Sequence, residues 1–295
     1  MGSSPLLKTA IFLFPLLLLS FTTLCYATRT LSSIATTQST VLTYHNGPLL
    51  SGNLSLSITW YGKFSPAQRS ILMDFLHSLN PTNPNPKAHP NPSVSSWWKT
   101  LESYNTFIPK KPQKISRNPN NAIGLEVQKQ TLDQSYALGR FLTRTQISSL
   151  AEKGSRGGDV GLVFTADDVA VEGFCMSSCA HHGSVPKTRW VYMWVGNSAS
   201  QCPGQCAWPF HQPIYGPQSQ PLVAPNGDVG VDGMVIGLAS TLAAAITNPF
   251  GNGLLPGAHI GSARSCVGLS WDLWEWGIPW LCWGAASGFN YRGEL

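Results

Sequence analysis

The sequence predicts an α/β fold, a single layered domain with a central mixed sheet. Stretches with the apolar alternation of strands take turns along the chain with stretches whose apolar residues recur at helical spacing. The chain has 295 residues and no internal repeat, which is enough for one large domain. Strands that alternate with helices favour a sheet covered by helices.

The first part of the chain predicts a strand, a helix and a long loop. Residues 54–62, LSLSITWYG, alternate like a strand with one buried face. Residues 65–79 predict a helix, with Ser65 as N-cap and Pro66 in its first turn. Residues 80–93 are rich in proline, which blocks helix and ladder hydrogen bonds, and predict an extended loop within the one domain. The residues expected to face inward from the helix are Ile71, Leu72, Phe75, Leu76 and Leu79.

The alternation continues through the middle of the chain. Helices are predicted at 94–104 and at 143–154, the second capped by Thr143 or Thr145 and ended by Gly154. The predicted strands are 121–130, the apolar parts of 159–174, and 188–197, of which TRWVYMWVGN is a strong central strand.

The stretch GMVIGLASTLAAAITNPFGNG, residues 233–253, predicts a helix without a single ionisable side chain. Its apolar residues recur at helical spacing. Asp232 is the expected N-cap, and Asn248 with Pro249 is expected to end the helix. The question it raises is whether this is a plain buried helix or a catalytic helix that has lost its chemistry.

The N-terminus predicts a secretory signal peptide at residues 1–27. Lys8 precedes an apolar run from Ala10 to Leu19, and Cys25 and Ala27 occupy the small-residue positions of a cleavage site. The run is too short to span a membrane, and we expect no spanning segment after cleavage. The sequence therefore predicts a secreted, extracellular protein.

The surface composition agrees with an extracellular protein. Only 11% of the residues are charged and the formal net charge is +5, without a basic stripe. This distribution argues against nucleic acid as a partner. It is compatible with weak adhesion to acidic polymers such as pectin. The expected partners are an extracellular protein or a cell-wall polysaccharide.

Six cysteines remain after signal cleavage, and an even number in a secreted chain predicts disulfides. Local bridges within each C-x-x-x-C pair and crossed bridges between the two pairs are equally open from the sequence. A zinc site made of the first four thiolates is the less favoured alternative. The six are Cys175, Cys179, Cys202, Cys206, Cys266 and Cys282.

One N-glycosylation sequon stands at Asn53–Ser55, where a surface turn is expected to lead into the first strand. We expect Asn53 to carry a glycan.

A catalytic site is the alternative function. His181, His182 and His211 lie close to the cysteines and are candidate metal ligands of a cell-wall-modifying hydrolase. Adjacent histidines in a strand point to opposite faces, which argues against one shared ion. No G-x-S-x-G motif is present. Asp228 and Asp232 stand in glycine-rich turns, where aspartate caps the backbone more often than it catalyses. We therefore expect no catalytic residue, no metal and no cofactor.

Four long blocks of sequence resemble the plant EXORDIUM-like, phosphate-induced protein family. They are residues 41–79, FCMSSCAHHG at 174–183, VGNSASQCPGQCAWPFHQPIYGP at 195–217, and residues 222–253. The resemblance predicts an EXORDIUM-like domain over 28–265. It implies a secreted protein of the apoplast or cell wall, tied to cell expansion and brassinosteroid-linked growth, without an established catalytic activity.

Residues 239–249, ASTLAAAITNP, also resemble the helix S-H-E-L-A-E-A-I-T-D-P of some zinc peptidases. Ser240 stands in place of a metal ligand, Thr241 in place of the general base and Ala244 in place of the next glutamate. Hydroxyls and a methyl group do neither task. This likeness predicts a zincin-like fold with a degenerate active-site helix, whereas chance similarity predicts plain packing.

Residues 266–295 depart from the family as a divergent, tryptophan-rich tail. Family members continue with a glycine-rich segment, a strand and a closing cysteine, so the match of Cys282 to that cysteine is in doubt. An exposed aromatic platform for sugars is one interpretation. An altered or truncated C-terminal end is the interpretation we favour.

Overall fold

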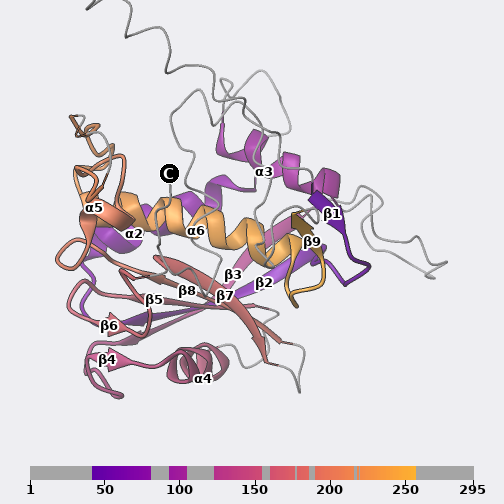
Figure 1. Cartoon of the computed structure of the whole chain (residues 1–295). Helices are drawn as coiled ribbons and strands as arrows, with labels where there is room; N and C mark the ends of the chain where they lie inside the picture. The colour runs from indigo at the N-terminus through magenta and orange to yellow at the C-terminus, as the bar shows by residue number, and fades with distance from the viewer. Residues whose placement is uncertain are drawn as a thin grey trace, which may run out of the picture. The chain divides into compact units, whose positions relative to one another are not determined.

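The computed structural model describes most of the domain (Figure 1). All described residues belong to one compact unit. They are residues 42–80, 93–104, 123–154, 160–176, 178–185, 190–215, 218 and 220–256.

A five-stranded mixed sheet forms the centre of this unit, in the order β3-β2-β5-β8-β7 (Figure 1). The strands β3, β2, β5 and β8 are parallel, and the edge strand β7 runs antiparallel to β8. The prediction of an α/β domain with a central mixed sheet is confirmed. Their bounds are β2 (Gly52–Tyr61), β3 (Ile123–Asp133), β5 (Val160–Thr165), β7 (Ala180–Val185) and β8 (Trp190–Gly196).

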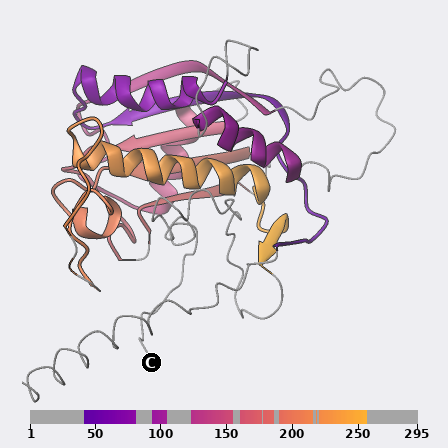
Figure 2. The ribbon, with the colours of Figure 1, turned by 90° about the horizontal axis from the view of Figure 1, so that it is seen from above.

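Helices cover both faces of the sheet (Figures 1 and 2). Three helices lie on one face: α2 (Pro66–Ser78), α3 (Val94–Glu102) and α6 (Val229–Thr247). The helix α4 (Arg144–Gly154) packs on the other face. The smaller elements are a two-stranded antiparallel pair, a two-stranded parallel pair and a short helix: β1 (Leu42–Tyr44) with β9 (Leu254–Pro256), β4 (Phe141–Leu142) with β6 (Ala170–Val171), and α5 (Pro203–Cys206).

The strand β2 is buried on both faces, so the expectation of a half-buried strand is wrong. Its even-numbered residues, such as Ile58, face α2 and α6, while Ser55, Ser57 and Thr59 face α4 and are also buried. Gly154 at the end of α4 lies so close that an added Cβ would come within 2.5 Å of the Thr59 hydroxyl. The alternation of apolar and polar residues in β2 therefore reflects two faces that are both covered by helices, one lined by apolar side chains and one by hydroxyl groups.

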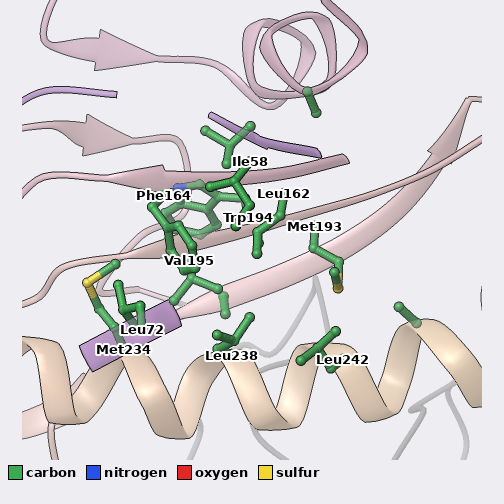
Figure 3. Close-up of a cluster of buried hydrophobic side chains, with 14 of the residues drawn as sticks. Ile58, Leu72, Leu162, Phe164, Met193, Trp194, Val195, Met234, Leu238 and Leu242 are labelled. Carbon is green, nitrogen blue, oxygen red and sulfur yellow. The ribbon is translucent and has the colours of Figure 1, made fainter. Parts of the chain in front are cut away.

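The core lies between the sheet and α6, with α2 at its side (Figure 3). Apolar side chains of the sheet meet apolar side chains of the two helices, and all of them are buried. Burial of each such side chain contributes roughly 1.5–3 kcal/mol. The residues labelled in the figure are Ile58, Leu162, Phe164, Met193, Trp194 and Val195 from the sheet, and Leu72, Met234, Leu238 and Leu242 from the helices.

Two helix starts follow the prediction. Ser65 caps α2 by accepting from the Gln68 backbone N–H at 3.1 Å, in a capping box with Pro66 in the first turn. For α4, the structure selects Thr143 over Thr145, since the Thr143 hydroxyl accepts from the Gln146 backbone N–H at 3.2 Å.

The helix α6 begins one turn before the predicted start. Its N-cap is Asp228, whose carboxylate accepts from the Val231 backbone N–H at 3.0 Å. Asp232 lies inside the helix, is buried, and accepts from the Asn226 backbone N–H at 3.0 Å and from the Asn226 side chain. Naming Asp232 as N-cap was wrong, because that carboxylate ties down the preceding loop instead. Asn248 ends the helix as predicted.

No segment long and apolar enough to span a membrane is expected from the sequence after residue 27, and α6 corrects this expectation. By length and apolar composition, α6 alone among the helices of the described residues would suffice to cross a bilayer. Most of it is buried in the domain, against β7, β8 and α2. A core helix covered on several sides meets the same compositional test as a spanning helix.

Candidate functional site

Two disulfides fasten the loops at the ends of β7 and β8. Cys175 bonds Cys202 with Cα atoms 5.7 Å apart, and Cys179 bonds Cys206 at 5.4 Å. The crossed pairing left open by the sequence is therefore the observed one, and the local pairing is wrong. Thiols consumed in these bonds cannot form the alternative zinc site. Cys266 and Cys282 lie outside the described residues.

The three candidate histidines do not converge. In β7, His181 pairs with Trp194 and lies on the α4 face, while His182 pairs with Met193 and lies on the α6 face. The prediction of opposite faces is confirmed. His211 follows α5, is exposed, and its Nδ1 lies 3.0 Å from the Gln212 carbonyl oxygen. Among the described residues, no three His, Cys, Asp or Glu side chains group in a way that suits a metal ion.

His182 has a structural contact at the end of α6. Its Nε2 lies 3.0 Å from the carbonyl oxygen of Asn248, the residue that ends that helix. Burial lowers the pKa of His182, and the Asn248 contact opposes that effect. The imidazole therefore joins β7 to the C-terminus of α6.

An aromatic strip lies on the opposite, α4-facing side of β7 and β8. It consists of Trp190, Tyr192 and Trp194 of β8 together with His181 of β7. Trp194 is fully buried and donates its indole N–H to the Thr165 hydroxyl at 3.0 Å. Trp190 and Tyr192 are partly exposed, and their rings stack with centroids 6.3 Å apart. The strip thus runs from the core to the surface.

His181 is the polar member of the aromatic strip and is 8% exposed. Its ring lies 5.3 Å from that of Trp194 and 5.8 Å from that of Tyr192, centroid to centroid. Neither ring nitrogen has a hydrogen-bond partner among the described residues. A neutral imidazole carries one donor and one acceptor, so this histidine has two unused hydrogen-bonding positions.

A positive charge stands beside the strip. Burial, together with the smaller effects of the Arg144 and His182 charges, lowers the pKa of His181 from 6.5 to about 3. Burial raises the pKa of Tyr192, and the Arg144 charge opposes this. Arg144 is the first residue of α4 and forms no ion pair within the described part of the chain. Its guanidinium is therefore within electrostatic reach of both rings.

We expect acid to destabilise the domain through His181. Its pKa is lower in the folded state than in the unfolded chain, so between pH 6.5 and pH 3 the unfolded chain binds more protons. The contribution of neutral His181 to the free energy of unfolding is complete above pH 6.5 and is lost as the pH falls from 6.5 toward 3. Between pH 8 and pH 5 the free energy of unfolding should drop by about 2 kcal/mol on this account.

Urea unfolding of the wild type and of His181→Phe at both pH values measures this contribution. His181→Phe should show a smaller loss between the two, and the control His211→Asn should lose as much as the wild type, because His211 is exposed. An equal loss in all three proteins would contradict the assignment to His181.

The positions of the supposed peptidase helix lie in the middle of α6. Thr241 is 4% exposed and Ala244 is 2% exposed, while Ser240 is partly exposed. One turn earlier, Gly237 faces Ala180 of β7, since an added Cβ would lie 3.4 Å from the alanine methyl group. This stretch of α6 therefore runs beneath the antiparallel edge strand.

Sequence reasoning missed Arg144, Trp190 and Tyr192. The alternation of Trp190, Tyr192 and Trp194 in TRWVYMWVGN was the available signal, since alternate strand residues share a face. No signal in the sequence joins Arg144 to that face, because helix packing alone brings it there. Asp228 caps the backbone, as expected for an aspartate in a glycine-rich turn, although the sequence assigned the N-cap of this helix to Asp232; the Asp228 Oδ2 accepts from the Gln68 side chain at 2.9 Å.

Asn53, the sequon asparagine, is the second residue of β2 and is exposed. Its glycosylation remains a prediction. The predicted signal peptide and the tail 266–295 lie outside the described residues.

Fold and site together define an α/β domain in which two disulfides join the segments flanking β7 and β8 and the three candidate histidines lie apart. The family model "Phosphate-induced protein 1 conserved region" matches residues 42–270. The chain belongs to this family, as the resemblance predicted. It is 47% identical to Protein PHOSPHATE-INDUCED 1 of Nicotiana tabacum, over 86% of this chain and 80% of that protein. It is 48% identical to Protein EXORDIUM of Arabidopsis thaliana, over 86% of this chain and 81% of that protein. No solved structure matches the chain.

Proposed function

We propose that this protein is secreted to the apoplast or cell wall and acts there by binding, without catalysis, in the regulation of cell expansion. The pairing of Cys175 with Cys202 and of Cys179 with Cys206 carries the proposal. Such bonds form and persist in oxidising compartments. The N-terminal sequence supports export, and the link to brassinosteroid-linked growth follows from the family resemblance.

The structural contacts of the candidate catalytic side chains support a function without catalysis. His182 contacts the end of α6, Asp228 caps that helix, and Asp232 holds the preceding loop. His181 belongs to no group of three or more His, Cys, Asp or Glu side chains in the described residues. A hydrolytic metal site needs several convergent ligands and a base. The metal-assisted hydrolase is therefore the alternative that the experiment below has to exclude.

We propose further that α6 is the remnant of a zinc-peptidase helix and that the fold is zincin-like. The sequence likeness at residues 239–249 supports this. So does the position of Ser240, Thr241 and Ala244 in a helix that packs beneath an antiparallel edge strand. The helix would then have kept its packing and lost its ligands. The first experiment of the Discussion tests this proposal.

Export is tested with the full chain expressed in plant cells. We expect the protein in the medium or wall fraction, with a mature N-terminus near Thr28, because small residues follow the apolar run. An intact Met1 in a membrane fraction would refute secretion. Elemental analysis of the same material should find no stoichiometric zinc. Bound zinc, lost together with a wall-hydrolysing activity in His211→Ala, would instead establish the hydrolase.

A further inference from the structure

The two disulfides are in contact with each other. The Sγ atoms of Cys202 and Cys206 belong to different bonds, yet they lie 3.6 Å apart in the buried part of the structure. Cys202 is the N-cap of α5 and Cys206 is its last residue, and the Cys206 backbone N–H donates to the Cys202 carbonyl oxygen at 3.0 Å. The four sulfur atoms therefore form one contiguous cluster at the first turn of α5.

This sulfur cluster has a buried half and a more accessible half. Cys202 and Cys206 are 6% and 8% exposed, whereas Cys175 and Cys179 are partly exposed. Met176, in the same loop as the latter two, is 79% exposed, so this loop lies at the surface. Each disulfide thus joins one partly exposed cysteine to one buried cysteine. A thiol in solution reaches either bond at its partly exposed cysteine, and the buried cysteine is then the leaving group.

The backbone of Cys175 favours opening of its own bond first. Its φ is +64°, in the left-handed region that residues other than glycine seldom adopt. Cys175 alone among the four bonded cysteines has a positive φ. Such a conformation persists only where the surrounding structure enforces it, and here the chain is held by the bond to Cys202. Opening that bond allows the loop to relax.

We propose that the two disulfides form a redox switch, in which opening of one bond rearranges the other. A dithiol reductant attacks the Cys175 Sγ and leaves Cys202 as a thiolate. The Cys202 thiolate attacks the neighbouring Cys206 Sγ, and the Cys179 thiolate departs. The second thiol of the reductant then closes the reductant's own disulfide and frees Cys175.

The steps balance in atoms and electrons. The dithiol is oxidised to a disulfide, and its two hydrogens end on the thiols of Cys175 and Cys179. The protein exchanges two crossed disulfides for a single local one, between Cys202 and Cys206. Residues four apart in a helix have Cα atoms about 6 Å apart, which lies within the range of about 4.4–6.8 Å that disulfides span.

The packing favours the internal attack over a second reaction with solvent. Cys202 is held against Cys206 in a buried position, so its effective concentration there far exceeds that of a dissolved thiol. Exchange keeps the buried pair bonded and releases the partly exposed pair, which removes the covalent tie between α5 and the loop before β7. The switch goes beyond the proposed function, since it adds a response to a reductant and is tested on the purified, oxidised full chain.

The variant Cys175→Ser tests the exchange without a reductant. It leaves Cys202 as a free thiol in contact with Cys206, so the thiol should pass to Cys179. Iodoacetamide traps the exposed thiol, and mass mapping without reduction locates the label. We expect labelled Cys179 to exceed labelled Cys202 by about tenfold or more, because accessible thiols react faster than buried ones.

The matched control is Cys202→Ser, which removes the other sulfur of the same bond. Its free thiol is Cys175, which is itself partly exposed and is not the sulfur in contact with Cys206. The label should therefore fall on Cys175 and leave the Cys179–Cys206 bond intact. Labelled Cys179 should be about tenfold or more below its level in Cys175→Ser.

The wild type tests the switch itself. An equimolar amount of dithiothreitol, followed by trapping with N-ethylmaleimide, should give one main partly reduced species, with thiols at Cys175 and Cys179 and a Cys202–Cys206 bond. Thiols at Cys175 and Cys202 beside an intact Cys179–Cys206 bond would overturn the proposal. So would a label found mainly on Cys202 in the variant Cys175→Ser.

Two further outcomes are separable. If Cys175→Ser does not fold, the wild-type measurement still decides. A protein that stays inside the cell but exchanges its bonds after purification would refute the proposed function and leave the switch standing. A secreted protein that keeps the Cys179–Cys206 bond when Cys175–Cys202 is reduced would do the reverse.

Discussion

Changing Ser240→His, Thr241→Glu and Ala244→Glu together should unfold the domain in zinc-free buffer. Thr241 and Ala244 are 4% and 2% exposed, so the two new carboxylates would be buried without partners. An unpaired buried charge costs several kcal/mol, and a domain is stable by only about 5–15 kcal/mol. Circular dichroism and calorimetry of the triple variant measure the loss. The control Ala67→Glu with Ser70→Glu adds the same charges at exposed positions of α2 and should stay folded.

Zinc then decides the ancestry of α6. If the helix is a remnant of a zinc-peptidase helix, added zinc should bind the triple variant and restore a cooperative transition, while the parent takes up none. Ligand binding to the folded state stabilises it by mass action. A triple variant that stays unfolded at saturating zinc would refute the ancestry. A variant that folds without zinc would refute the burial of these positions instead.

Removing both disulfides should destabilise the domain more than the sum of removing each. Each bond joins residues 27 apart. The chain-entropy model gives about 3.6 kcal/mol for a loop of that length, and about 2.5 kcal/mol for the short loop that a second, neighbouring bond closes. With one bond removed, the other still confines the long loop. Each single removal should therefore cost about 2.5 kcal/mol, and the double removal about 6 kcal/mol.

The measurement is urea unfolding of Cys175→Ser with Cys202→Ser, of Cys179→Ser with Cys206→Ser, and of the fourfold variant. Met176→Ser, at a position 79% exposed in the same loop, is the control and should be close to the wild type. Mass mapping without reduction should recover the two crossed peptides. Strictly additive losses would mean that the bonds constrain independent loops, and free thiols at all four positions would refute both bonds.

The start of α2 was predictable from the sequence because the signals that define it are local. Ser65 and Pro66 define the start of α2 through hydrogen bonds within one turn. The start of α6 was misplaced because two aspartates in glycine-rich turns offer the same local signal. Only the fold distinguishes Asp228, which caps the helix, from Asp232, which reaches back to Asn226.

The burial of β2 and the pairing of the cysteines depended on contacts between distant segments. Ser57 and Thr59 look solvent-facing in an alternating pattern, yet α4 covers them. The C-x-x-x-C spacing suits a local bridge as well as a crossed one. The crossed bonds form because the segments before β7 and after β8 meet at one end of an antiparallel pair.

By itself the sequence determined the α/β class, the family, most helix and strand positions, and the opposite orientation of His181 and His182. These follow from periodicity, capping and alternation, which act over a few residues. The tertiary structure alone decided which cysteines pair, that His211 lies apart from the other two histidines, and that the charge of Arg144 affects the pKa values of Tyr192 and His181. The physical reason is that these relations join segments far apart in the sequence, which approach one another when the shared core is buried. The hydrophobic effect is non-directional, so a local sequence pattern does not specify which distant segments meet.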